Sequence, residues 1–186
     1  MDTVNRLSWV TIVLHWLVAI PMIGLISLGL LMVNLELFDY YGLHKSIGVM
    51  LAAVILLRVA WRIRQGWPTP VASYPKAQAL LAKAVHWSLI ISTVLMPLSG
   101  MLFSGASGHG FGVFGLSLVS ENLDAAKPGA VIPLSKFWST VGQTVHEYMG
   151  YLLILAIIVH IAGVIKHHYF DKDTTLLRML GRHKML

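Results

Sequence analysis

Four apolar stretches, separated by polar connections, dominate the sequence. They cover about residues 9–33, 44–63, 80–103 and 145–165, and each approaches the ~20 residues that a helix needs to cross a bilayer. The pattern predicts an all-α integral membrane protein, an up-and-down four-helix bundle formed by residues 1–186 as a single domain. The connection at about 105–144 is long and rich in glycine and apolar residues, and we expect it to fold back over one mouth of the bundle as a cap.

Basic residues fall in the connections and are shared unevenly between the two sides of the predicted bundle. One side has eleven lysines and arginines, whereas the other has only Lys45, Lys127 and Lys136. Because cytoplasmic connections carry the excess of basic residues, we expect both termini in the cytoplasm. We call that side inner and the opposite side outer. The net charge of +6 then reflects membrane topology, so the expected surroundings are lipid and not nucleic acid.

The amino-acid composition limits the kinds of redox centre that the chain can hold. The chain is 56% hydrophobic and 12% charged, which is too apolar for a soluble domain. It has no cysteine, and this excludes disulfides, iron–sulfur clusters and covalently attached c-type haem. Any redox centre must therefore be held by histidine or methionine.

Histidines occur at two depths in the predicted helices. His146 and His160 lie fourteen residues apart, so they share one helix face and are separated by roughly 21 Å along its axis. His44 lies at the outer depth with His146, whereas His15 and His86 lie at the inner depth with His160. Ionisable groups inside a membrane are costly and suggest function, and imidazoles at two depths predict two haems with histidine ligands on their irons. Depth pairs His44 with His146 but leaves three pairings open at the inner level.

The fourteen-residue spacing recurs on the other helices. It leads from His15 to Gly29, from His86 to Gly100, and from His44 to Arg58. Glycine at the outer level would leave room for a flat macrocycle to lie against the backbone. Arg58 would lie among the inner histidines, where it could bind a haem propionate.

Several short motifs resemble one family of membrane proteins. These segments are Leu14–Leu17, His44–Gly48, Arg58–Arg62, Pro97–Gly100, His146–Glu147 and the tail His167–Met179. On them the chain is similar to the bacterial cytochrome b561 family of small four-helix dihaem proteins, which includes a superoxide:ubiquinone oxidoreductase. In fold and haem content it also resembles the cytochrome b subunits of formate dehydrogenases and hydrogenases.

This resemblance implies a fuller set of expectations. In the related subunits the inner haem is held between the first and fourth helices, so His15 is expected to pair with His160 and His86 to lie beside that haem. The protein would be a multi-pass protein of the bacterial inner membrane. It would pass electrons through two b-type haems between an outer donor and ubiquinone.

Two hypotheses about activity follow from the resemblance. The chain is either an oxidoreductase that oxidises superoxide at the outer haem, or a haem b membrane anchor that passes electrons for a separate periplasmic oxidoreductase. For the quinone, His167 lies seven residues beyond His160, two turns further toward the inner side and on nearly the same face. A histidine there can donate hydrogen bonds and protons near neutral pH, which predicts a quinone site at His167.

Overall fold

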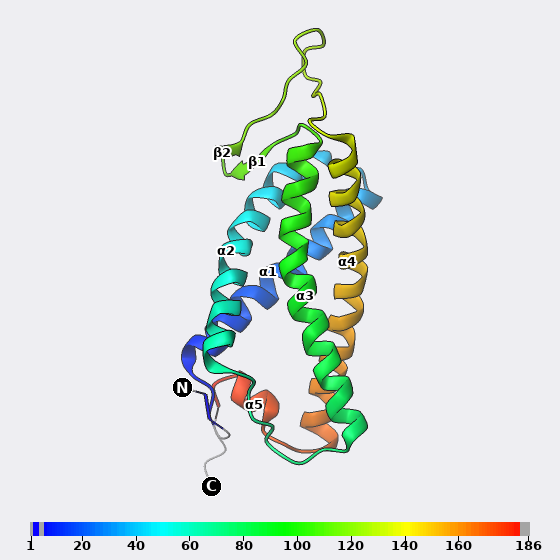
Figure 1. The fold of residues 1–186 in the computed structure, drawn as a ribbon. Coiled ribbons are helices and arrows are strands. Elements are labelled where there is room, and N and C mark those ends of the chain that lie inside the picture. Colours follow the sequence, from blue (N-terminus) through cyan, green and yellow to red (C-terminus); the bar gives the residue numbers. More distant parts are fainter. Residues whose placement is uncertain (1, 4–5, 183–186) are drawn as a thin grey trace.

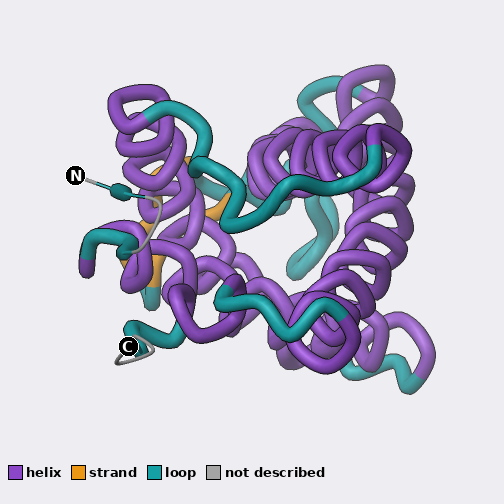
Figure 2. Tube along the Cα trace, turned by 90° about the horizontal axis from the view of Figure 1, so that it is seen from below, coloured by secondary structure: helices purple, strands orange, loops and turns teal. Residues whose placement is uncertain are grey.

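Four long helices form the molecule. The computed structural model describes residues 2–3 and 6–182, and its long helices are α1 (Trp9–Asn34), α2 (Tyr41–Gln65), α3 (Lys76–Ala106) and α4 (Lys136–Ile165). All four are long and apolar enough to cross a membrane. They run up and down side by side (Figure 1), and Figure 2 looks along them from the inner end. The predicted all-α bundle is therefore confirmed.

The predicted start of the fourth helix is wrong. We expected a helix over about 145–165, but α4 begins at Lys136 and is capped by Ser135, whose hydroxyl accepts the backbone N–H of Trp138 at 3.3 Å. Hydropathy marks only the part of a helix that crosses the membrane, and the first turns of α4 contain polar residues. The outer connection is correspondingly shorter than the expected 105–144, and His146 lies inside α4 and not at its beginning.

The outer connection also contains a small β-hairpin, which the sequence did not predict. Its strands, β1 (Phe111–Val113) and β2 (Leu116–Val119), pair antiparallel. The chain passes very close to itself here, because a Cβ added to Gly110 or Gly112 would overlap the carbonyl oxygens of Val119 or Leu116. The hairpin packs chiefly on α2, with fewer contacts to α3. It therefore covers one side of the outer end, and the rest of the connection extends away from the bundle (Figure 1).

Small residues allow α3 and α4 to pack more closely than the other helices. A Cβ on Gly142 would lie 2.5 Å from the backbone nitrogen of Phe103, and Ser92 and Ser99 are buried on α3. Such small residues are typical of helix interfaces in membranes, where van der Waals contact drives association. The close pair fixes α4 against the bundle, and α4 supplies two of the histidines.

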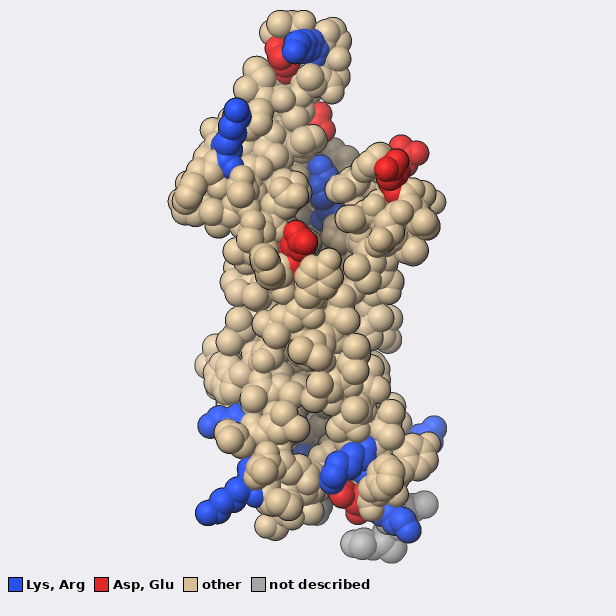
Figure 3. Space-filling model, turned by 90° about the vertical axis from the view of Figure 1, so that its right-hand side faces the viewer, with Lys and Arg blue, Asp and Glu red and all other residues tan. Residues whose placement is uncertain are grey.

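The inner end is closed by the tail. A π-helical turn, η2 (Lys166–Phe170), continues α4, and a short helix, α5 (Thr175–Met179), follows it. Arg178 of α5 is buried and donates to the carbonyls of Thr3 at 2.9 Å and Thr69 at 3.3 Å. The tail thus joins the amino-terminal segment to the α2–α3 connection. On the face shown in Figure 3, charged residues lie toward the two ends and leave an uncharged band between them.

Candidate haem sites

The structure brings the five membrane histidines together in two groups. The outer pair consists of His44 of α2 and His146 of α4, with ring centroids 6.2 Å apart. The inner group consists of His15 of α1, His86 of α3 and His160 of α4. Within it, the ring of His160 lies 6.4 Å from that of His15 and 5.5 Å from that of His86.

One histidine of the outer pair, His146, has the hydrogen bond that is typical of a metal-binding histidine. The Nδ1 of His146 lies 2.9 Å from the Met96 carbonyl oxygen. Metal-binding histidines usually donate their second ring nitrogen in this way, which leaves Nε2 free. Among the described residues the buried Nδ1 of His44 has no hydrogen-bond partner. A buried polar atom without a partner is unusual, and it indicates that this ring is arranged for something other than protein contacts.

Glycines lie beside both outer rings. A Cβ at Gly29 would lie 3.5 Å from Cε1 of His44, and one at Gly100 would lie 3.1 Å from Cε1 of His146. The spacing thus identified glycines at the level of the outer histidines. In the structure, however, the space beside each glycine is taken by an imidazole, because the rings lean against the backbone of α1 and α3.

A small cavity of about 30 Å³ adjoins the outer pair. Apart from the two histidines, the side chains around it are apolar, so the cavity offers water few hydrogen-bond partners. It is lined by Met22, Leu25, Ile26, His44, Gly48, Leu51, Met96, Pro97 and His146.

The inner group differs from the outer pair because it includes a cation. The Nη2 of Arg58 lies 3.1 Å from Nδ1 of His15. A guanidinium can only donate, so in this structure Nδ1 of His15 accepts the bond. We expected Arg58 to lie among the inner histidines, and it does, but its partner here is an imidazole. The Nδ1 of His86 instead lies 2.7 Å from the Ala82 carbonyl oxygen, the arrangement that His146 also shows.

Two ring separations, that of His44 from His146 and that of His15 from His160, fit two imidazoles bound to one metal. A metal–imidazole bond is about 2 Å long and the ring centre lies roughly 1 Å further, so two imidazoles on opposite sides of one iron have centres about 6 Å apart. The 6.2 Å of His44 and His146 and the 6.4 Å of His15 and His160 agree with this value. The 5.5 Å between His86 and His160 is shorter. The residues present therefore fit haem ligation at both levels.

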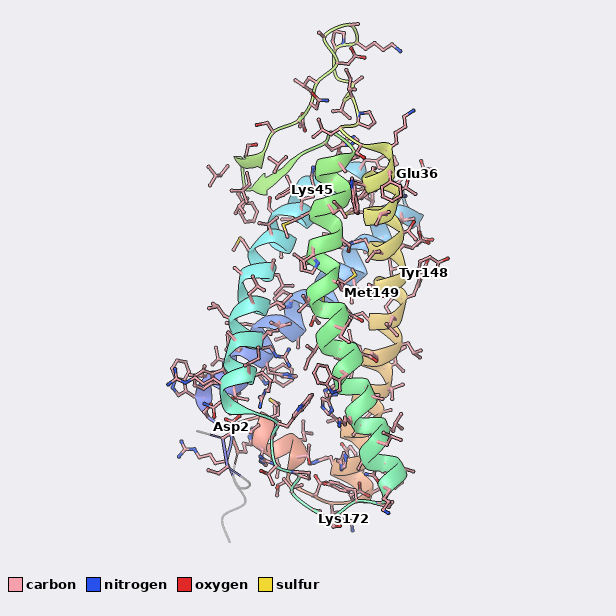
Figure 4. The ribbon with its side chains drawn as sticks, in the orientation of Figure 1. Asp2, Glu36, Lys45, Tyr148, Met149 and Lys172 are labelled. Atoms are coloured by element: carbon pink, nitrogen blue, oxygen red, sulfur yellow. The ribbon has the colours of Figure 1, made fainter. Side chains whose placement is uncertain are left out.

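Lys45 is not a free cation at the outer end. Its Nζ donates to the carbonyls of His109 at 3.4 Å and Gly110 at 3.2 Å, and so fixes the base of the hairpin. Figure 4 shows it near the outer ends of α2 and α3, beside the strands. Lys127 and Lys136 remain exposed.

His167 belongs to a hydrogen-bonded cluster at the inner end. Its Nδ1 lies 2.8 Å from Asp173 and 3.2 Å from Asp171, and the Tyr74 hydroxyl donates to Asp173 at 2.6 Å. Burial and the bond to Asp173 raise the pKa of Tyr74 to about 12. Burial would raise the pKa of Asp173, but bonds from Tyr74, Thr175 and His167 outweigh it and hold the pKa below its usual value.

Sequence reasoning missed Tyr74 and Asp173. Tyr74 lies in the α2–α3 connection and bonds to a residue ninety-nine positions away, so no local sequence pattern could predict the contact. The only signal was the tail motif, which contains both His167 and Asp173. The π-helical turn that carries His167 is a second indication, because such turns are frequent at functional sites.

Comparison with known proteins identifies the family. A sequence model of prokaryotic cytochrome b561 matches residues 6–182. Cytochrome b561 homolog 2 of Escherichia coli (strain K12) is 34% identical over 186 residues, covering 97% of this chain and 94% of the relative. Cytochrome b561 homolog 1 of the same organism is 27% identical over 194 residues, covering 97% and 99%.

A third relative has a named activity. The probable superoxide oxidase CybB of Yersinia pestis is 23% identical over 143 residues, covering 76% of this chain and 75% of the relative. The match to the family extends across all four long helices and the tail. The chain therefore belongs to the prokaryotic cytochrome b561 family, as a multi-pass protein of the inner membrane that carries electrons across it on b-type haem.

Proposed function

We propose that this single domain holds two b-type haems and moves electrons one at a time between an outer donor and quinone at the inner end. His44 and His146 would bind the outer iron, and His15 and His160 the inner iron. The observation that carries the proposal is the pair of ring separations, 6.2 and 6.4 Å, at two levels of α4. Both described ends of the chain lie at the basic end, which supports cytoplasmic termini.

The protein's own groups prepare the two sites. When bound, the haems would supply reversible one-electron chemistry. The imidazoles would hold the irons, and the apolar residues around the outer pair exclude water. If His15 bound iron through Nε2, its Nδ1 would carry a proton and could no longer accept the bond from Arg58. The guanidinium would then be available to a propionate and would supply a positive charge at the inner site.

At the inner end, His167 is our candidate for the quinone site. Its Nδ1 is held by Asp173, which leaves Nε2 to face a ligand. Lys166 is engaged with Asp171 at 2.8 Å, so His167 is the group of this cluster that can donate to a quinone oxygen. Replacing His167 with alanine should slow quinone reduction, with both haem spectra unchanged. The matched control is Tyr169→Ala, an exposed side chain on the same π-helical turn, and equal turnover in wild type and His167→Ala would move the site elsewhere.

The outer donor is the least constrained part of the proposal. The activity named for the Yersinia relative favours superoxide. Charge does not add support, because Lys45 is bound to hairpin carbonyls and an anion would meet an excess of acids. The outer acids are Glu36, Asp39, Glu121, Asp124 and Glu147.

That charge balance favours a second candidate, a haem b conduit for a separate periplasmic oxidoreductase. Purification from native membranes distinguishes the two. The purified chain alone should reduce ubiquinone when superoxide is generated, if it is the oxidase. A periplasmic protein that copurifies in equal amount and is needed for quinone reduction would support the conduit.

The haem sites themselves are tested by counting haem. A pyridine haemochrome assay should find two haems per chain in the wild type. His146→Ala should retain only the inner haem, and His160→Ala only the outer one, because α4 supplies a different residue to each site. His109→Ala, in the outer connection, should keep both. Full haem content in either α4 variant would contradict the assignment.

A further inference from the structure

The outer hairpin exposes an uncharged apolar surface. Residues 110–120 contain no charged side chain, and within them Phe114, Leu116 and Leu118 are 65%, 67% and 55% exposed. A soluble surface seldom exposes several large apolar side chains next to one another without a binding role. Something outside the chain is therefore expected to cover this surface.

Hydrogen bonds to α2 fix the depth of the hairpin tip. The backbone N–H of Phe114 donates to the hydroxyl of Ser46 at 3.0 Å. Ser46 lies five residues beyond Tyr41, the first residue of α2, which is about 7.5 Å along the helix. It lies two residues beyond His44, a histidine of the outer pair. The tip is therefore level with that pair and not above the bundle.

Aromatic residues mark the membrane boundary above this level. Phe38 and Tyr41 stack at the outer end of α2, with ring centroids 6.1 Å apart, and such aromatics gather where a membrane meets water. Below them, α2 exposes Leu43, Met50 and Leu57 at seven-residue spacing, a stripe that faces lipid in a membrane-spanning helix. The tip of the hairpin lies at the same depth as the upper part of this stripe.

The backbone of the hairpin is also suited to a poorly hydrated place. Polar backbone groups near lipid must find partners within the protein. The strands pair with each other, Ser46 binds the tip, and the Gly110 carbonyl accepts from both Ser104 and Lys45. These contacts hold the hairpin against α2 at its base and at its tip.

The turn itself places an aromatic side chain where one is disfavoured. Phe114 has φ 44° and Gly115 has φ 91°, so both central residues are left-handed. Asparagine, aspartate or glycine is preferred at such positions, and a bulky residue there is strained. A water-exposed turn gains nothing from phenylalanine here, whereas a turn immersed in lipid does.

We propose that the hairpin is an interfacial anchor, which inserts Phe114, Leu116 and Leu118 into the boundary between headgroups and acyl chains beside α2. The occupant of the exposed surface is lipid of the outer leaflet. Exposed apolar side chains at the depth of the headgroup boundary are what attaches an interfacial element to a membrane surface. The anchor would hold the outer end of α2, and hence His44, in a fixed orientation.

The absence of cysteine makes a direct test simple. Leu116→Cys and Leu118→Cys are each made in the haem-loaded full chain and placed in nanodiscs of phosphatidylcholine and phosphatidylglycerol. The reaction rate with a membrane-impermeant maleimide is then measured. Ala126→Cys, in the exposed part of the outer connection, is the aqueous control, and Leu56→Cys, which is exposed on α2, is the lipid control.

The expected result is a rate at Leu116→Cys and Leu118→Cys at least tenfold below that of Ala126→Cys. Both side chains are exposed in the protein itself, so slow reaction means that lipid covers them. All variants should react equally in sodium dodecyl sulfate, and native haem spectra show that they are folded. Rates equal to that of Ala126→Cys in nanodiscs would overturn the proposal. Protection found only in native membranes would also overturn it, and would assign the surface to a protein partner.

Discussion

The outer pair and the inner group are built from the same residue type but have different surroundings. His44 and His146 lie against glycine and apolar side chains, and the nearest lysine, Lys45, is bound to hairpin carbonyls. The inner group adds a third histidine and places Arg58 directly on His15. A partly buried cation favours the reduced, less positive state of a nearby iron. We therefore expect that packing controls haem binding at the outer site and that the charge of Arg58 controls the reduction potential at the inner site.

The largest effect we expect distinguishes His15 from His86 at the inner level. His15→Ala should lose the inner haem completely, because the ring separation from His160 fits a shared iron. His86→Ala should keep both haems, since its Nδ1 bond to Ala82 can be lost without removing a ligand. Haem content and low-spin spectra measure both outcomes. Loss of haem in His86→Ala with retention in His15→Ala would reverse the pairing.

The levels of these histidines could be predicted from sequence because depth in a membrane is one-dimensional. Helix spans fix how deep each residue lies, so five histidines sort into two groups before any contact is known. The sequence does not predict which side chain fills the space beside a given residue. Spacing located Gly29 and Gly100 correctly, but only the structure shows that imidazoles occupy the adjoining space.

Contacts between distant segments could not be predicted. The hairpin is held by Ser46, sixty-eight positions from Phe114, and Arg178 binds Thr3 across most of the chain. The early start of α4 was missed for another reason, because its first turns lie beyond the apolar stretch that hydropathy detects. Membrane depth is thus encoded locally, whereas the closures at the two ends depend on tertiary contacts.

A second prediction tests whether the outer site is set by shape. In Gly100→Ala the new methyl would lie 3.1 Å from Cε1 of His146, whereas in Gly29→Ala it would lie 3.5 Å from His44. Overpacking costs about 1–3 kcal/mol, so Gly100→Ala should weaken outer haem binding about fivefold or more, and Gly29→Ala should leave it nearly normal. Haem titration of each variant measures this. Equal affinities in the two variants would contradict it.

A third prediction tests the role of charge at the inner site. Arg58→Met should lower the reduction potential of the inner haem by roughly tens of millivolts, as expected for a partly buried charge. The outer haem should keep its potential, and Arg58→Lys should have a smaller effect at the inner site. Potentiometry resolves the two haems by their spectra. Equal shifts at both haems would mean that Arg58 acts through the whole bundle.

The smallest effect we expect is a local loosening of the inner end at low pH. The inner end is held by carboxylates, whereas the outer end is held by hydroxyls and carbonyls. Burial would raise the pKa of Asp2, but bonds from Ser8 and Thr11, with the charge of Arg62, outweigh it and hold the pKa below its usual value. The pKa of Asp173 is lowered in the same way. Folding therefore favours the ionised carboxylates. Their stabilisation is present above the ordinary pKa and is lost as the pH falls through the lower folded value.

Acid should thus loosen the tail before the hairpin. Spin labels at Leu180→Cys, beside α5, and at Leu118→Cys, on β2, report the two ends separately. As the pH falls below about 4, the ordinary pKa of an aspartate, the Leu180 label should become more mobile while the Leu118 label keeps its line shape. Asp173→Asn should give the same mobile tail already at neutral pH, because an amide cannot replace a carboxylate that accepts bonds from Tyr74, His167 and Thr175. If both labels loosened at one pH, the two ends would share a single acid transition and would not be held by different chemistry.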